Sequence, residues 1–155
     1  MEGETTMRKT ILSAALTLVL TLTLGAQQKG KKAQSLYERL GGKPAITAVV
    51  DEFVARVAAD AKINRYFAAA AGDPARLAAF KGKLVDQICQ ASGGPCTYMG
   101  KNMKDAHARM GITGAEFDAL VGDLVGALDK FKVPEREKGE LLGALGPMKS
   151  DIVTK

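Results

Sequence analysis

Apolar residues recur along most of this chain at spacings of three, four and seven, which is the period of an amphipathic helix. The pattern begins after residue 34, and short polar or glycine-containing segments separate the helices that it predicts. No segment of strand length alternates between apolar and polar positions. The helices expected from the spacing cover residues 36–40, 43–57, 63–70, 74–92, 101–110, 114–128 and 134–152. We therefore predict one all-α domain over residues 35–155.

Helix start and stop signals agree with this pattern. Asp73 followed by Pro74 is a strong start, because aspartate caps free backbone N–H groups and proline is tolerated at the first helical position. Thr113 and Glu116 have the spacing of a capping box, in which each residue bonds the backbone of the other. The glycine pair at 93–94 is expected to end the helix before it.

The first 26 residues carry a different pattern, which is typical of a secretory signal peptide. A basic start at 8–9 precedes a largely apolar, uncharged run over 11–26, and polar residues follow. We expect cleavage near Ala26, export to the bacterial periplasm and no stable membrane span afterwards, with residues 27–34 as a flexible basic linker. The alternative is an uncleaved membrane anchor, although the run falls short of the roughly 20 residues that span a bilayer.

The composition of the chain excludes several classes of protein and of metal site. Of 155 residues, 46% are hydrophobic and 25% are charged, a soluble globular balance that excludes a polytopic membrane protein. The formal net charge is +5, but no aromatic residues interleave with a basic patch, so we expect no nucleic-acid partner. One histidine and two cysteines exclude a site with several histidines and a four-cysteine metal cluster.

The two cysteines, Cys89 and Cys96, lie seven residues apart across Gly93-Gly94-Pro95, a segment that can turn back on itself. In an oxidising compartment such a pair can form a disulfide between a helix end and the following loop. Two separate thiols, with Cys89 buried on the helix, are the alternative. The chain has no Cys-x-x-Cys-His motif, so covalent attachment of a c-type haem is excluded.

The single histidine, His107, shares a helix face with Met103, because the two are four residues apart. Another predicted helix offers an apolar wall of Phe80, Leu84 and Ile88. An apolar slot that faces one imidazole is the geometry of a haem pocket. A lone histidine is otherwise most often a surface or structural residue, and the chain would then be a helical interaction module without a cofactor.

The order of short motifs along the chain resembles that of the group I truncated haemoglobins. The matching segments are LYERLGG (36–42), AVVDEF (48–53), YF (66–67), FKGK (80–83), GGP (93–95) and Tyr98-x-Gly100-x-x-Met103-Lys104-x-x-His107-x-x-x-Gly111-Ile112-Thr113. The ordered set covers nearly all of the chain after the predicted signal peptide. The resemblance implies a truncated globin fold, a two-over-two α-helical sandwich around a non-covalently bound haem b.

The resemblance also implies roles for individual residues. His107 matches the proximal ligand of the haem iron, and Phe67 matches the phenylalanine that packs on the porphyrin. Lys81 and Lys83 match positions near the propionates, and Lys83 is alternatively a sixth iron ligand. The remaining matches to haem contacts are Phe53, Val54, Phe80, Leu84, Ile88, Tyr98, Met103, Ile112 and Phe117.

Two positions depart from the family pattern. Many group I members place a tyrosine and a glutamine where this chain has Val54 and Leu84, and neither of these can donate a hydrogen bond to oxygen. A charge-related hydrogen bond is worth roughly 1.5–3 kcal/mol, so we expect oxygen to leave about one to two decades faster, with CO and NO less affected. The expected function is reversible binding of O2, NO or CO rather than catalysis. NO detoxification or redox chemistry with an unidentified reductase is the alternative.

Overall fold

The computed structural model describes residues 33–155. The predicted signal peptide and most of the predicted linker lie outside the described residues. The elements, in chain order, are α1 (Leu36–Arg39), α2 (Gly42–Ala59), η1 (Asn64–Tyr66), α3 (Ala68–Ala71), α4 (Pro74–Ala91), α5 (Met103–His107), α6 (Gly114–Lys130), α7 (Glu135–Leu145), η2 (Gly146–Met148) and α8 (Lys149–Ile152). Residues 33–155 contain no strand, which confirms the all-α prediction.

The predicted caps are present. The Asp73 carboxylate accepts hydrogen bonds from the first free N–H groups of α4, and Pro74 occupies the first helical position. Thr113 and Glu116 form the predicted capping box at the start of α6, and Ser35 forms a second box at α1. These starts are local chemistry, which is why the sequence predicted them.

The predicted helix ends are less accurate. The helix expected over 134–152 breaks after Leu145, because Pro147 has no N–H to continue the ladder; a 3-10 turn and the short α8 follow. The helix expected over 101–110 ends at His107, since Ala108 is extended and Arg109 has a positive φ of 75°. The helix expected over 63–70 divides into η1 and α3.

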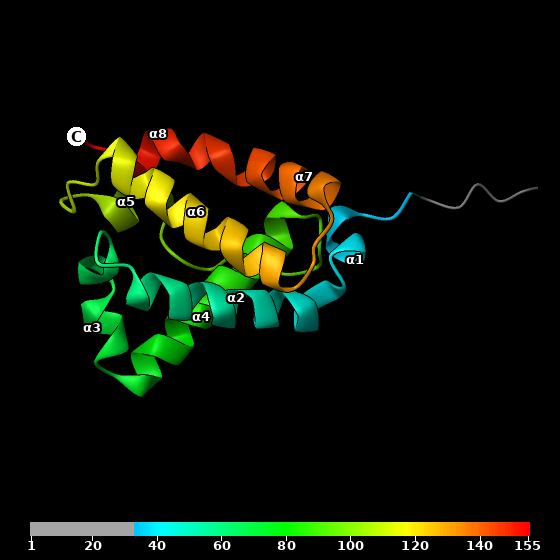
Figure 1. Ribbon diagram of the computed structural model, residues 1–155, viewed down its shortest axis with the longest axis horizontal. Coiled ribbons are helices and arrows are strands. Elements are labelled where there is room, and N and C mark those ends of the chain that lie inside the picture. The colour runs from blue at the N-terminus through cyan, green and yellow to red at the C-terminus, as the bar shows by residue number, and fades with distance from the viewer. Residues whose placement is uncertain (1–32) are drawn as a thin grey trace, which may run out of the picture. The chain divides into compact units, whose positions relative to one another are not determined.

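Four long helices hold the core in two layers. Figure 1 shows α6 and α7 on one side of the described domain and α2 and α4 on the other. Helix α2 packs on both α4 and α6, and α7 packs on α1 and α4. The buried core cluster consists of Ile46, Val49, Val50, Phe53, Val57, Ile63, Val85, Ile88, Cys89, Leu124, Ala127, Leu128 and Leu141. Among residues 33–155, no helix is both long and apolar enough to cross a membrane.

Candidate functional site

The imidazole of His107 is held in one tautomer by the backbone of its own helix. It lies half-buried at the last position of α5, with Nδ1 2.7 Å from the carbonyl oxygen of Met103. A carbonyl only accepts, so Nδ1 carries the proton and Nε2 keeps its lone pair. In the described part of the chain Nε2 makes no hydrogen bond. A hydrogen bond from Nδ1 to a backbone carbonyl is the arrangement that orients a histidine to bind a metal through Nε2.

The helix that carries His107 contributes no residue to the buried core. Helix α5 is five residues long, and none of them is buried. Its start is capped by Asn102, whose side-chain oxygen accepts from the N–H of Asp105 at 2.8 Å. After the helix, Ile112 is buried, and its carbonyl accepts from the N–H groups of Thr154 and Lys155 at 2.9 and 3.2 Å. The segment is therefore fixed at both ends by hydrogen bonds.

One face of α4 looks onto α5. Phe80, Leu84 and Gln87 follow one another at spacings of four and three and so share that face. The Gln87 amide nitrogen lies 3.5 Å from Met103 Sδ and 3.1 Å from Met148 Sδ. This contact therefore joins α4, which carries the predicted apolar wall, to α5, on which Met103 shares a face with His107. Sequence reasoning missed Gln87, although its spacing from Leu84 places it on the wall.

A hollow of about 190 Å³ opens between α2, α3 and α4. The rings of Phe67 and Phe80 meet at its side, with centroids 5.6 Å apart and planes tilted by 56°. Lys81 Nζ pairs with Asp51 Oδ1 at 2.8 Å. The hollow is lined by Asp51, Val54, Ala55, Val57, Ala58, Phe67, Ala70, Ala71, Leu77, Phe80 and Lys81. Four predicted site residues, Val54, Phe67, Phe80 and Lys81, therefore come together here.

The other predicted site residues lie elsewhere. Phe53 and Ile88 are each 6% exposed and belong to the buried core, so they do not line the hollow. Leu84 is half-buried and packs against that core. Lys83 is exposed and has no ion-pair partner among residues 33–155. Phe117 is half-buried, with Lys149 Nζ 5.3 Å from its ring centroid.

The predicted capping box of α6 extends into a polar network beside Phe67, and its links to Tyr66 and Arg65 were not predicted. Glu116 Oε2 accepts from the N–H of Thr113 at 2.8 Å, from its hydroxyl at 2.9 Å and from the Tyr66 hydroxyl at 3.0 Å, and Arg65 pairs with the same carboxylate. Hydrogen bonds from Thr113, then Tyr66 and the charge of Arg65, lower the pKa of Glu116 to about 2. The network ties the segment just before Phe67 to the start of α6.

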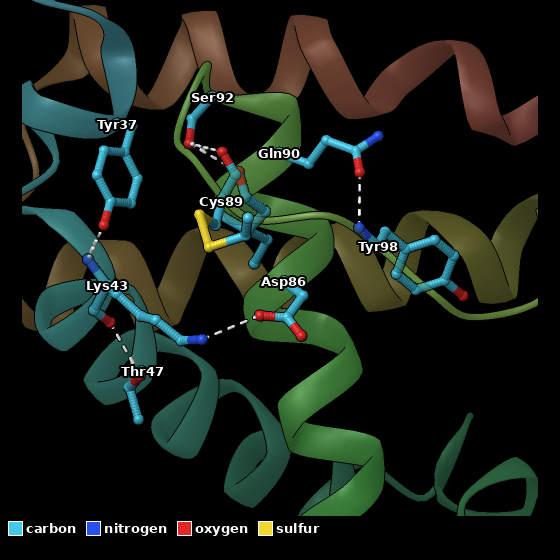
Figure 2. Close-up of a disulfide and its surroundings, with 10 residues drawn as sticks. Tyr37, Lys43, Thr47, Asp86, Cys89, Gln90, Ser92 and Tyr98 are labelled. Atoms are coloured by element: carbon cyan, nitrogen blue, oxygen red, sulfur yellow. Dashed lines mark hydrogen bonds and ion pairs between the residues drawn. A yellow bond between two sulfur atoms is a disulfide. The ribbon is translucent and has the colours of Figure 1, made fainter.

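The disulfide joins the end of α4 to the loop that leads toward α5. Cys89 and Cys96 are bonded, and Figure 2 shows the bond beside the last turn of α4. Tyr98, a predicted haem contact, donates its backbone N–H to Gln90 Oε1 at 2.7 Å. Its hydroxyl donates to the carbonyl of Lys101 at 3.0 Å. The loop is thus tied to α4 by the disulfide, by the Tyr98–Gln90 hydrogen bond and by backbone hydrogen bonds from Gly93 and Gly94 to the carbonyls of Gln90 and Cys89.

Comparison with known proteins identifies the family. The model of the bacterial-like globins matches residues 35–154. The chain belongs to the bacterial-like globins. Group 1 truncated hemoglobin GlbN of Mycolicibacterium paratuberculosis is 37% identical to this globin over 120 residues, which are 77% of this chain and 85% of the relative. GlbN of Synechocystis is 34% identical over 116 residues, 72% of this chain and 90% of the relative.

Solved structures agree with this assignment. The Fe(III) truncated hemoglobin of Tetrahymena pyriformis matches with a TM-score of 0.71 and 29% identity, covering 79% of this chain and 100% of that one. The 2/2 hemoglobin of Synechococcus, described with covalently attached heme, matches with a TM-score of 0.70 and 30% identity over 79% and 100% of the two chains. The predicted two-over-two globin fold is therefore confirmed. As a member of this family the chain is a haem-binding, gas-binding globin.

Proposed function

We propose that this globin binds haem between α4 and α5, with Nε2 of His107 as the iron ligand. The observation that carries the proposal is the 2.7 Å bond between His107 Nδ1 and the Met103 carbonyl, which leaves Nε2 free and oriented. The donor set fits the group, because α5 supplies one half-buried imidazole and α4 supplies the half-buried apolar side chains Phe80 and Leu84. When bound, the haem iron supplies reversible coordination of a small gas. The protein orients the imidazole and offers the apolar side chains Phe80 and Leu84 on α4, while the Gln87 amide on the same face is directed at Met103 Sδ and Met148 Sδ.

The direct test is haem uptake by the full chain. We expect a Soret band in the wild type, and its loss in His107→Ala. Met103→Leu, which keeps the backbone carbonyl, is the matched control and retains the band. A wild type that stays colourless, helical and stable would instead favour a helical interaction module without a cofactor.

We propose that this chain binds haem b without a covalent bond. Both cysteines are bonded to each other, so neither is free to form a thioether with a vinyl group. The only histidine is the proposed iron ligand. The Synechococcus hemoglobin, in contrast, is described with covalently attached heme, so the two proteins are expected to differ in whether the haem can be extracted. Acidified organic solvent is expected to extract all of the haem here, and haem retained on the chain would contradict the proposal.

Val54, Phe80 and Leu84 are three positions that the resemblance assigns to haem contacts, and none of these side chains can donate a hydrogen bond to a gas. We therefore propose that oxygen leaves quickly, and that CO and NO are held with less loss. Replacing a wall residue by a donor tests this directly. Leu84→Gln and Val54→Tyr are each expected to slow oxygen release by roughly one to two decades, while Leu84→Met leaves it unchanged. Stopped-flow kinetics measures the rates, and slow release by the wild type would contradict the proposal.

The two lysines of the wall differ in their contacts. Lys81 is paired with Asp51, whereas Lys83 is exposed and unpaired among residues 33–155. We propose that Lys83 contacts a haem propionate. The Lys83→Ala variant is then expected to keep the ferric absorption spectrum of the wild type. A spectral change on this substitution would show that Lys83 is a sixth iron ligand instead.

Reversible gas binding accounts for this site better than turnover does. Haem-based oxidation of NO needs long-held oxygen and a reductant, and the apolar wall argues against the first requirement. Peroxidase chemistry needs an acid–base group beside the iron, and Val54, Phe80 and Leu84 supply none. Steady NO consumption by the full chain with a reductase would instead establish detoxification or redox chemistry.

We also propose that the protein is exported. The apolar run at 11–26 is the primary support, and the disulfide between Cys89 and Cys96 is chemistry of an oxidising compartment. Expression of the full chain in a bacterium, followed by fractionation and N-terminal sequencing, tests this. We expect a periplasmic product that begins near Gln27. A full-length product in the cytoplasm would contradict export, and one in the membrane would indicate an uncleaved anchor.

A further inference from the structure

The position of His107 depends on parts of the molecule outside its own helix. A helix of five residues is too short to be stable alone, because nucleation costs more than its few hydrogen bonds return. Helix α5 also buries none of its residues in the core. Its packing partner is α8, another short helix, and Figure 1 shows the two at one end of the domain. Something else must therefore fix α5 against α4.

The first connection is covalent and starts from the best-packed part of the fold. Cys89 is fully buried in the core cluster, whereas Cys96 lies in the loop beyond α4 and is half-buried. A methyl group at Gly94 would lie 2.7 Å from Cys89 Sγ, so a glycine is needed for the loop to fold this closely on α4. The disulfide therefore anchors the chain to the packed core immediately before the segment 97–107.

The second connection is the side chain of Gln90. Its Oε1 accepts the N–H of Tyr98 at 2.7 Å, two residues beyond Cys96, as Figure 2 shows. The Tyr98 ring then lies against Gly100, where a methyl group would be 2.1 Å from the ring hydroxyl. The hydroxyl donates to the Lys101 carbonyl. The next residue, Asn102, caps α5, so an unbroken series of contacts runs from α4 to the proposed iron ligand.

We propose that the Cys89–Cys96 disulfide and the Gln90 side chain are positioning groups that hold the segment 97–107 against α4 and so place His107 for haem. Only the consequence for haem rests on the proposed function. The consequence for the segment itself does not. Loss of either connection leaves α2, α4 and α6 packed and lets α5 open locally, because none of the core lies in the segment.

Amide hydrogen exchange of the full chain tests the placement. In Cys89→Ala/Cys96→Ala, we expect exchange in 97–107 to quicken roughly tenfold more than exchange in α6, which quickens only by the factor that the loss of global stability gives. Gln90→Ala, at an exposed position, gives a smaller change in the same segment. Gln90→Glu restores protection, because a carboxylate also accepts the Tyr98 N–H. Met99→Ala is the matched control within the segment, since Met99 is 86% exposed.

Haem loss to excess apomyoglobin provides the second readout. The double cysteine variant is expected to lose haem roughly tenfold faster than the wild type, and Gln90→Glu is expected to match the wild type. Unchanged exchange in 97–107, or an equal increase in α6, would overturn the positioning role. A full chain that takes up no haem would overturn the proposed function, while the exchange data would still decide this inference.

Discussion

The two walls of the proposed haem site are built in different ways. The wall opposite His107 rises from α4, which with α2 and α6 supplies every member of the buried core cluster except Ile63 and Leu141. The wall that carries His107 is α5, and none of the residues of α5 is buried. The first wall takes its shape from core packing, and the second takes its position from a disulfide, caps and backbone hydrogen bonds. Substitutions in the first wall should lower the stability of the fold, whereas substitutions in the second should displace His107.

The largest effect is expected from the core itself. Leu128 lies on α6, is 1% exposed and belongs to the core cluster on which the α4 wall is built. Leu128→Ala is expected to lower the free energy of unfolding by about 3 kcal/mol, since it removes buried methyl groups and leaves a cavity. Urea unfolding measures the change. Met103→Ala, on the other wall, is the control and should cost less than about 1 kcal/mol. Equal costs for the two variants would contradict the comparison.

The disulfide lies between the two walls and should have an intermediate effect on global stability. It closes a loop with a sequence separation of 7. Short loops return less entropy than long ones, so Cys89→Ala/Cys96→Ala is expected to lower the free energy of unfolding by about 2 kcal/mol. Urea unfolding of the oxidised wild type and the variant gives the difference. No loss of stability would show that the loop is held without the bond.

Two helix caps allow the same chemical change on the α5 wall and in the core that supports the α4 wall. Asn102 caps α5, and Thr113 caps α6. Removing either side chain with alanine should cost about 1 kcal/mol. For Thr113→Ala the loss should appear in global unfolding, because α6 belongs to the core. For Asn102→Ala it should appear only as faster amide exchange within α5. A global loss for Asn102→Ala would show that α5 unfolds with the core.

The smallest effect is a pH dependence on the core side. The native pKa of Glu116 is about 2, below its ordinary value of 4.5, chiefly because of hydrogen bonds from Thr113. Between these pH values the folded state binds fewer protons than the unfolded state, so stability falls as the pH falls from 4.5 to 2. Glu116→Gln should show a flatter loss over that window in acid-unfolding curves. Curves of equal slope would contradict this role.

The helix starts could be predicted from the sequence more accurately than the helix ends. Asp73 and Thr113 act on neighbours two or three residues away, so the starts of α4 and α6 could be read from the chain. The break after Leu145 also had a local signal in Gly146-Pro147, but the apolar stripe continues through it and favoured one long helix. Sequence patterns show which face is apolar, and they show local stops less reliably when that face is unbroken.

The site itself was only partly predictable. Spacing placed Met103 beside His107, and family resemblance supplied the role of the histidine. The contact of Gln87 with Met103 joins residues on different helices, and no local spacing contains it. The same holds for the Glu116 carboxylate and Tyr66, which are 50 residues apart. Contacts of this kind depend on how the helices pack, so only the folded structure contains them.

The central claim is that Nε2 of His107 is the protein ligand of the haem iron. The most direct measurement is the absorption spectrum of His107→Gly with haem, recorded with and without free imidazole. We expect the variant to lack the wild-type spectrum, and free imidazole, filling the space left by the side chain, to restore it. A His107→Gly variant that shows the wild-type spectrum without imidazole would contradict ligation of the iron by His107.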